Sequence, residues 1–174
     1  MANRAVVSWL RKRTFSFVLY GLIGAGADRR ASVEFKTVNP QVIEQFRGGG
    51  EIVAAPGVGR ENHILLTTVG RKSGRERTTP VKVFLKQDDR VIVVAGNGGR
   101  ASNPAWYLNL VAEPRVRIED AQGSYVAVAT VLSGDERDDL WGVIQEQNPG
   151  LVGYLAGAGR EIPIVAFTGE GASK

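Results

Sequence analysis

Cysteine is absent from this chain of 174 residues, and histidine occurs once, as His63. The absence of cysteine excludes disulfide bonds, thiolate nucleophiles and cysteine-ligated metal sites. A single histidine argues against a histidine-based triad or metal site, so we expect no bound metal and place His63 at a strand end. The apolar run at residues 15–27 is shorter than the roughly 20 residues that a membrane-spanning helix needs.

The composition is that of an ordinary globular protein with an excess of glycine. Apolar residues make up 43% of the chain and charged residues 23%, which is typical of a soluble domain. The length is sufficient for one domain with a real core. The net charge of +4 is compatible with an anionic small molecule, a membrane surface or nucleic acid, and does not choose among them.

The N-terminal part, residues 1–60, is expected to be a helical or extended segment ahead of a folded domain at residues 61–174. Basic residues at positions 11–13 precede the apolar run at residues 15–27. This pattern favours an amphipathic helix that lies on the domain or on a lipid surface. A signal peptide that ends in the small residues 25–27 is the alternative.

The pattern from residue 63 onward predicts strands joined by short turns. Val81, Val83 and Leu85 alternate with the side chains between them, as in a half-buried strand. Asn103 is a good N-cap residue with Pro104 at the first helical position. The expected strands are residues 63–69, 79–85, 90–95, 115–119, 124–132 and 162–167, and the expected helices are residues 41–46, 104–111, 133–147 and 149–155. We therefore predict a mainly β (α+β) fold, a six-stranded antiparallel barrel with peripheral helices.

A basic loop at residues 71–77 carries four cations, Arg71, Lys72, Arg75 and Arg77. Arginine and lysine in a glycine-containing turn hold phosphate or carboxylate through charge-assisted hydrogen bonds. A solvated hairpin tip without a ligand is the alternative. The spacing is not that of a Walker phosphate loop.

A glycine loop at residues 96–100 follows the third expected strand. With Ala101 it fits G-x-G-x-x-A, and Glu119 and Asp120 lie about 20 residues further on, as in a dinucleotide-binding fingerprint. The next helix begins only at Pro104 and the neighbouring strands pair as hairpins, which argues against that fold. We expect these glycines to let backbone N–H groups approach a ligand closely, and a plain flexible loop is the alternative.

Adjacent aromatic residues, Trp106 and Tyr107, lie in the expected helix. Because neighbouring residues on a helix point in different directions, at most one of them is expected to be fully buried. The functional interpretation is that the pair forms a wall for a ring system. The alternative is that Leu108 and one aromatic residue simply pack in the core. Tyr154 is a candidate gate or proton donor, and a rim tyrosine without chemistry is the alternative.

Three segments together resemble the deazaflavin-dependent nitroreductase family: LLTTVGRKSGRERTTPV at residues 65–81, AGNGG at 95–99 and NPAWYLNL at 103–110. The family consists of actinobacterial split β-barrel oxidoreductases that use coenzyme F420. The resemblance extends from about residue 60 to the final strand, which includes IPIV at residues 162–165. It implies the six-stranded split barrel of the FMN-binding type, in agreement with the hairpin pattern.

The resemblance implies a cofactor with a deazaflavin ring, a phosphodiester and an oligoglutamate tail. The basic loop is expected to meet the anionic part, the glycine loop to line the ring or linker, and the aromatic helix to close the site. The cofactor-binding residues implied are Arg71, Lys72, Ser73, Arg77, Thr78, Thr79, Val94, Ala95, Gly96, Asn97, Ala105, Trp106, Tyr107, Leu108 and Asn109. The reaction implied is hydride transfer from reduced coenzyme F420 to a quinone-like, nitro or other electron-poor acceptor.

The sequence departs from the family pattern in two places. Asn148, Leu151 and Gly157 stand where nitroreductase members carry aromatic residues, so that only Tyr154 remains. This argues against nitroimidazole activation and predicts a pocket that is wider or differently shaped. Asn97 replaces a family lysine and removes one charge near the cofactor.

Other functions stay open. The same fold binds FMN or haem in other proteins, although the arginine-rich loop favours the longer anionic tail. A non-enzymatic cofactor carrier, or a basic module that stacks nucleic acid on Trp106, is a further alternative, but no nucleic acid is expected. The family's variable N-terminus is compatible with a cytoplasmic protein placed peripherally on the membrane, and split barrels often pair as homodimers.

Overall fold

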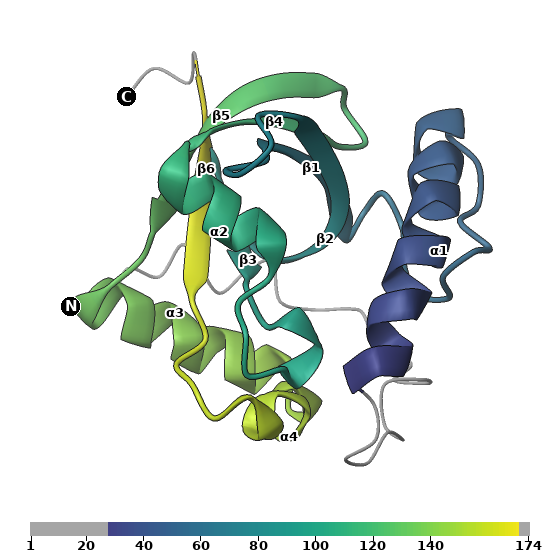
Figure 1. Cartoon of the computed structure of the whole chain (residues 1–174). Coiled ribbons are helices and arrows are strands. Elements are labelled where there is room, and N and C mark those ends of the chain that lie inside the picture. Colours follow the sequence, from purple (N-terminus) through teal and green to yellow (C-terminus); the bar gives the residue numbers. More distant parts are fainter. Residues whose placement is uncertain (1–27, 171–174) are drawn as a thin grey trace.

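The protein folds into a closed barrel of six antiparallel strands (Figure 1). The computed structural model describes residues 28–170, with side chains from Thr37 onward. The strands follow the order β1-β2-β3-β6-β5-β4, and pairing of β1 with β4 closes the barrel. The strands are β1 (His63–Val69), β2 (Glu76–Gln87), β3 (Arg90–Val94), β4 (Arg115–Glu119), β5 (Ser124–Val131) and β6 (Ile164–Gly169). The predicted six-stranded antiparallel barrel is confirmed.

Several strand boundaries differ from those that the sequence pattern predicted, and pairing with partner strands explains the starts of β2 and β6. β2 begins earlier than expected because Glu76 still pairs with Val69 at the end of β1. β6 begins later than expected, at Ile164, where it meets Val94 at the end of β3. Strand ends depend on the reach of the partner strand, which the local pattern does not encode.

A bulge in β2 interrupts the predicted alternation. The register with β3 shifts between Val83 and Leu85. Val83 therefore packs against the barrel interior, whereas Phe84 and Leu85 both pack against the apolar layer outside β3. The extra residue changes the direction in which the following side chains point, so that β2 contributes side chains to two apolar cores.

The barrel interior forms the first core. It is filled from all six strands, and the helix α2 (Ala105–Ala112) adds Trp106 and Leu110 at one end. Figure 1 shows α2 crossing in front of the barrel. The buried members are Ile64, Leu66, Val81, Val91, Val93, Ala95, Trp106, Leu110, Val116, Ile118, Ala127, Ala129, Val165 and Phe167.

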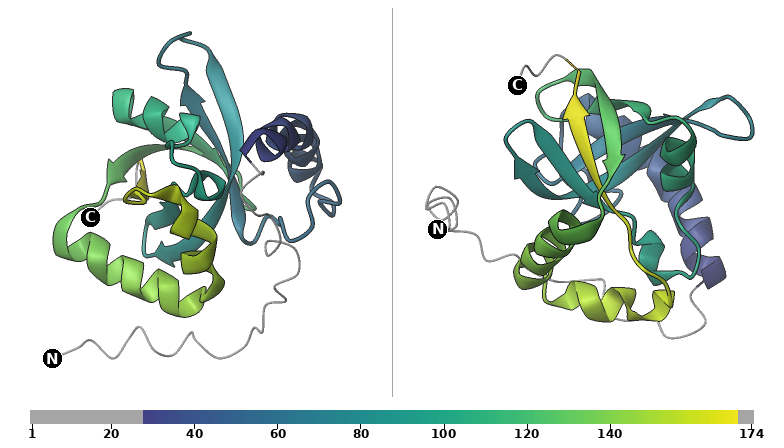
Figure 2. Two further views of the ribbon diagram at one scale, coloured as in Figure 1. Left: turned by 60° about the horizontal axis from the view of Figure 1, so that its bottom comes forward. Right: turned by 90° about the vertical axis from the view of Figure 1, so that its left-hand side faces the viewer.

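A second core lies between the outer face of β3 and β6 and the C-terminal helices. Ile92 and Ala166 face outward here, against Leu140 and Ile144 of α3. Figure 2 shows α3 and α4 together along one side of the barrel. The elements that cover this face are α3 (Gly134–Gln147), α4 (Gly150–Leu155) and the 3-10 turn η3 (Ala156–Ala158), and a further 3-10 turn, η2 (Asn97–Gly99), lies in the glycine loop.

The helix α1 (Asp28–Gly48) covers a third face of the barrel. Val42 and Phe46 are buried against Leu65, which points outward from β1. The guanidinium of Arg47 donates to both carboxylate oxygens of Glu119, at 2.8 and 2.6 Å. The expected amphipathic helix or signal peptide, with its apolar run at residues 15–27, lies outside the residues that the structure describes.

The predicted start of this helix was wrong. A helix was expected only at residues 41–46, directly after Pro40, but Pro40 lies inside a helix of 21 residues. Proline removes one intrahelical hydrogen bond and normally kinks or ends a helix. Val38, before the proline, packs in the same apolar cluster as Val42 and Phe46, after it, so tertiary contacts on both sides of Pro40 favour one continuous helix.

Asn103 was also wrongly predicted as the N-cap of the helix after the glycine loop. Pro104 occupies that position with an extended backbone (φ −64°, ψ 150°), and no side chain caps α2. The side-chain oxygen of Asn103 is buried without a hydrogen-bond partner. A residue before proline is pushed toward extended geometry, which displaces the helix start by one residue.

Within residues 28–170, no helix combines the length and apolar character needed to cross a bilayer.

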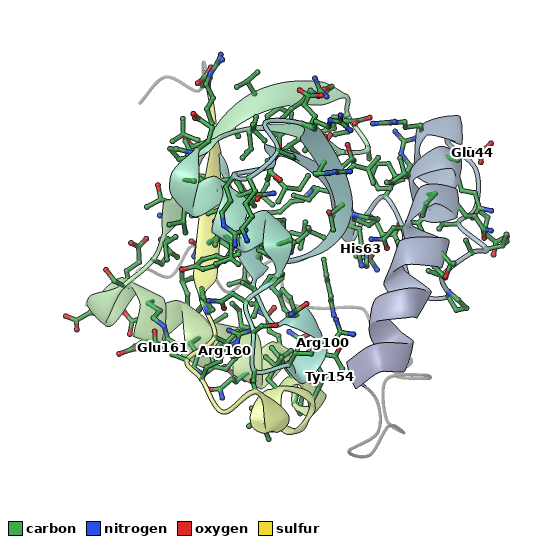
Figure 3. The ribbon with its side chains drawn as sticks, viewed as in Figure 1. Glu44, His63, Arg100, Tyr154, Arg160 and Glu161 are labelled. Carbon is green, nitrogen blue, oxygen red and sulfur yellow. The ribbon has the colours of Figure 1, made fainter. Side chains whose placement is uncertain are left out.

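The imidazole of His63 should make stability depend on pH. His63 lies between the barrel and α1 (Figure 3), and burial lowers its pKa to about 4, with the charge of Lys82 adding to the shift. The unfolded chain accepts this proton near pH 6.5, so stability falls as the pH drops from 6.5 toward 4. We expect a loss of about 2 kcal/mol between pH 7.5 and 5.

Urea unfolding at pH 7.5 and at pH 5 measures this loss. His63→Gln removes the titrating group and should reduce the difference between the two pH values, whatever its effect at pH 7.5. An equal pH dependence in wild type and His63→Gln would contradict the assignment.

Candidate functional site

A cavity of about 340 Å³ opens where the basic loop meets the start of α2. One wall comes from the ends of β1 and β2, which the basic loop connects, and the other comes from α2. The lining residues are Thr68, Gly70, Arg71, Lys72, Ser73, Arg77, Thr78, Thr79, Ala105, Trp106 and Asn109. The chain thus brings its basic loop and its aromatic helix to a single place.

Backbone hydrogen bonds give the basic loop a defined turn. The N–H of Gly70 donates to the Arg75 carbonyl at 2.8 Å, and the N–H of Gly74 donates to the Gly70 carbonyl at 2.7 Å. A Cβ atom at Gly70 would lie 2.7 Å from the Ser73 hydroxyl oxygen and 3.1 Å from the Arg75 carbonyl. Glycine is therefore required at the base of the turn, while the side chains of residues 71–77 stay exposed.

The cations of the basic loop have no carboxylate partner among the side chains that the structure describes. Among residues 37–170, no carboxylate lies within ion-pair distance of Arg71, Lys72, Arg75 or Arg77. The acidic residue of the loop, Glu76, instead accepts a hydrogen bond from Arg117 at 2.9 Å. The cavity mouth is therefore positively charged and ready to pair with an anion.

A buried asparagine joins the basic loop to α2. Asn109, with 5% of its surface exposed, donates from Nδ2 to the Thr68 hydroxyl at 3.0 Å. Its Oδ1 accepts the backbone N–H of Arg71 at 3.2 Å. One amide thereby ties the end of β1, the first residue of the basic loop and the aromatic helix to one another.

The two aromatic residues of α2 have different surroundings. Trp106 is buried and reaches the cavity, whereas Tyr107 is half-buried. Their rings meet edge to face, with 6.3 Å between centroids and 85° between planes. The prediction that at most one of them is fully buried is confirmed, and Leu108 is only half-buried.

The remaining predicted site residues lie elsewhere. Val94 and Ala95 are buried, while Gly96 and Asn97 are half-buried in the glycine loop. These four residues, together with Tyr107 and Leu108, do not line the cavity. Thr68 and Gly70 do line it and were missed, although both flank a motif that the sequence analysis had identified.

The glycines at residues 96–99 have a packing reason that the sequence did not reveal. A Cβ atom at Gly96 would lie 2.7 Å from a methyl carbon of Leu155. At Gly99, where φ is +74°, it would lie 2.4 Å from the Tyr154 carbonyl oxygen. Gly96 and Gly99 therefore admit the close approach of α4. The expected approach of a ligand to this loop stays a prediction.

Tyr154 and His63 are both outside the cavity lining. Tyr154 is 36% exposed on α4, and a Cβ atom at Gly98 would contact its hydroxyl oxygen at 3.4 Å. Figure 3 shows Tyr154 close to Arg100, beside the glycine loop. His63 lies at the start of β1, as expected.

Comparison with known proteins identifies the family. The F420H(2)-dependent quinone reductase family model matches residues 39–169. An F420H(2)-dependent quinone reductase of Mycobacterium tuberculosis is 31% identical over 146 residues, which cover 81% of this chain and 94% of that protein.

Solved structures agree with this family assignment and with the fold. An F420-H2 dependent reductase, FDR-A, has a TM-score of 0.54 at 31% identity, covering 61% of this chain and 93% of its own. A chain described as a domain-swapped dimer has a TM-score of 0.55 at 24% identity, covering 82% and 99% respectively, and supports the fold alone. The chain belongs to the F420H(2)-dependent quinone reductase family, enzymes whose cofactor is coenzyme F420, and the cofactor expected from the sequence resemblance is thereby confirmed.

Proposed function

We propose that the protein reduces a quinone-like or other electron-poor acceptor with a hydride from coenzyme F420, which binds between the basic loop and α2. The observation that carries this proposal is the cavity itself, in which Trp106 lies together with cations that have no carboxylate partner among the described side chains. Family membership supports the cofactor, and the charge of the cavity supports this binding site for it.

The residues present fit the anionic part of the cofactor. Arg71, Lys72 and Arg77 line the cavity without a carboxylate partner among the side chains that the structure describes. Guanidinium and ammonium groups bind phosphate and carboxylate through short charge-assisted hydrogen bonds. The hydroxyl groups of Ser73 and Thr79 add neutral donors to the same wall.

The ring end of the cofactor is assigned to the glycine loop and α2. Trp106 lies both in the barrel core and in the cavity lining, so it offers a rigid aromatic surface beside the cations. Val94, Ala95, Gly96 and Asn97 are assigned to the ring or linker by resemblance alone.

The bound cofactor supplies the hydride when it is reduced, and the protein supplies its placement. The basic loop binds the anionic tail of the cofactor. Trp106 limits the access of water to one side of the bound cofactor. Preorganised positive charge favours negative charge that develops on an electron-poor acceptor. Tyr154 is the candidate for the acceptor pocket, on the segment where Asn148, Leu151 and Gly157 replace family aromatic residues.

Fluorescence titration of the purified protein with coenzyme F420, and in parallel with FMN, tests the cofactor. We expect tight binding of F420 and little binding of FMN, because only F420 carries the long anionic tail. Lys72→Ala and Arg77→Ala should each weaken F420 binding by about 1.5–3 kcal/mol, the cost of one lost charged hydrogen bond.

Arg75→Ala is the matched control for these variants. Arg75 belongs to the same exposed loop but does not line the cavity, so its loss should leave the affinity nearly unchanged. If the protein preferred FMN, or if Lys72→Ala bound F420 as tightly as the wild type, the assignment of the F420 site to this cavity would be wrong.

Loss of the Asn109 amide should disturb both stability and binding. Asn109→Ala leaves Thr68 and the Arg71 N–H without their partner, which should lower the free energy of unfolding by about 1–3 kcal/mol. It should also weaken F420 binding because the basic loop loses its tie to α2.

Urea unfolding and the same titration measure these two effects. Asn103→Ala is the control, because the buried oxygen that it removes has no partner to lose. If Asn109→Ala were as stable as Asn103→Ala, the proposed tie would be wrong.

We also propose that residues 1–27 hold the enzyme at a membrane surface, where a quinone-like acceptor would be available. The basic residues at positions 11–13 and the apolar run after them motivate this placement. After lysis in low salt, the full chain should sediment with membranes and a chain without residues 1–27 should not. Recovery of all the full-length protein in the soluble fraction would contradict the proposal.

A further inference from the structure

The side chain of Arg160, between η3 and β6, makes an unusual set of hydrogen bonds. Its Nε donates to the Arg100 carbonyl at 3.2 Å and its Nη1 donates to the Glu161 carbonyl at 3.1 Å. Its Nη2 donates to the carbonyls of Ala95 at 3.0 Å and Gly96 at 3.4 Å. A single guanidinium therefore binds four backbone carbonyls (Arg160 is labelled in Figure 3).

Three of these carbonyls, those of Ala95, Gly96 and Arg100, belong to the two ends of the glycine loop. Ala95 and Gly96 lead into the loop from β3, and Arg100 is its last residue. The planar guanidinium fork fixes the distance between the two ends, which a flexible ammonium group cannot do as well. Arg160 thus closes the base of the glycine loop.

The helix α4 also packs against the glycine loop. Leu155 occupies the space at Gly96, and the Tyr154 carbonyl occupies the space at Gly99. The loop is therefore held by both a helix and a guanidinium, and removal of either contact should give it more freedom.

The charge of Arg160 has no acidic partner in the described part of the chain. Among residues with described side chains, no carboxylate lies within ion-pair distance of its guanidinium, while the adjacent Glu161 pairs with Arg137 at 2.8 Å. Burial lowers the pKa of Arg160, and interaction with Tyr107 of α2 opposes this shift. Arginine stays protonated under such conditions, so its positive charge remains beside the glycine loop and the aromatic helix.

We infer that Arg160 is a positioning residue for the deazaflavin ring, because it holds both ends of the glycine loop and leaves a positive charge beside it. This inference rests on the proposed function, in which the glycine loop contacts the ring. Under this inference the cations have two different roles. Those of the basic loop bind the anionic tail of the cofactor, whereas Arg160 positions the ring end by holding the backbone of the glycine loop.

The test compares intact coenzyme F420 with a deazaflavin fragment that lacks the phosphodiester and the oligoglutamate tail. Arg160→Met removes every donor, and should weaken binding of both ligands by the same factor, about tenfold. Lys72→Ala should weaken binding of F420 and leave binding of the fragment unchanged. Arg160→Lys keeps the charge but cannot span both ends of the loop, and should give an intermediate loss.

Arg137→Met is the matched control for stability. Arg137 lies nearby, donates to the Ile162 carbonyl at 3.3 Å and pairs with Asp138 and Glu161, but it does not contact the glycine loop. Thermal unfolding of each variant reports any general destabilisation. Arg137→Met should lower the Tm without changing the affinity for the fragment.

A second readout is the absorption band of F420 at saturating cofactor concentration. In Arg160→Met the band should shift toward that of the free cofactor, while in Lys72→Ala and Arg137→Met it should not. If Arg160→Met bound both ligands with wild-type affinity and left the absorption band unshifted, the inference would be overturned and the proposed function would stand. The same conclusion would follow if Arg137→Met lost as much affinity for the fragment as Arg160→Met. If Arg160→Met fails to fold, Arg160→Lys decides by the same criteria. Failure of the wild type to bind F420 would overturn the proposed function and this inference together.

Discussion

The buried amide of Asn109 is the interaction on which the geometry of the cavity depends. It bonds to the Thr68 hydroxyl at the end of β1 and to the N–H of Arg71, where the basic loop begins. A buried amide without partners is costly, so this arrangement is strongly preferred to any other. The backbone at Arg71 is therefore held in place, and the cationic side chains of the basic loop extend from it on the cavity that Trp106 also lines.

Charge is distributed unevenly around this fixed point. Away from the cavity, arginines pair with carboxylates, as Arg47 does with Glu119 and Arg115 with Glu170. Such exposed pairs contribute little to stability. The basic loop and Arg160 have no acidic partner in the part of the chain with described side chains, so the positive potential is concentrated near the cavity and the glycine loop. A cofactor with an anionic tail is the ligand that this distribution favours.

The sequence predicted much of the fold because apolar alternation and short turns are local signals. The six strands and their antiparallel pairing were recognised, as were the basic loop and the aromatic helix. The continuation of α1 through Pro40 was not, because burial of Val38, Val42 and Phe46 on the barrel, on both sides of the proline, outweighs its local preference. The close packing of the glycines at residues 96 and 99 against α4 was not predicted, because their neighbours in α4 lie more than fifty residues away in the sequence.

The family and its cofactor were determined by the sequence alone, because the basic loop, the glycine loop and the NPAWYLNL segment are contiguous motifs. Tertiary structure alone decided which of these residues share one cavity. It placed Arg71, Lys72 and Arg77 beside Trp106 while leaving Val94 and Ala95 in the barrel wall. Only the folded chain could bring Arg160 to the carbonyls of Ala95 and Arg100. The physical reason is that such contacts depend on the closure of the barrel and on helix packing across long sequence separations, which no local pattern of residues encodes.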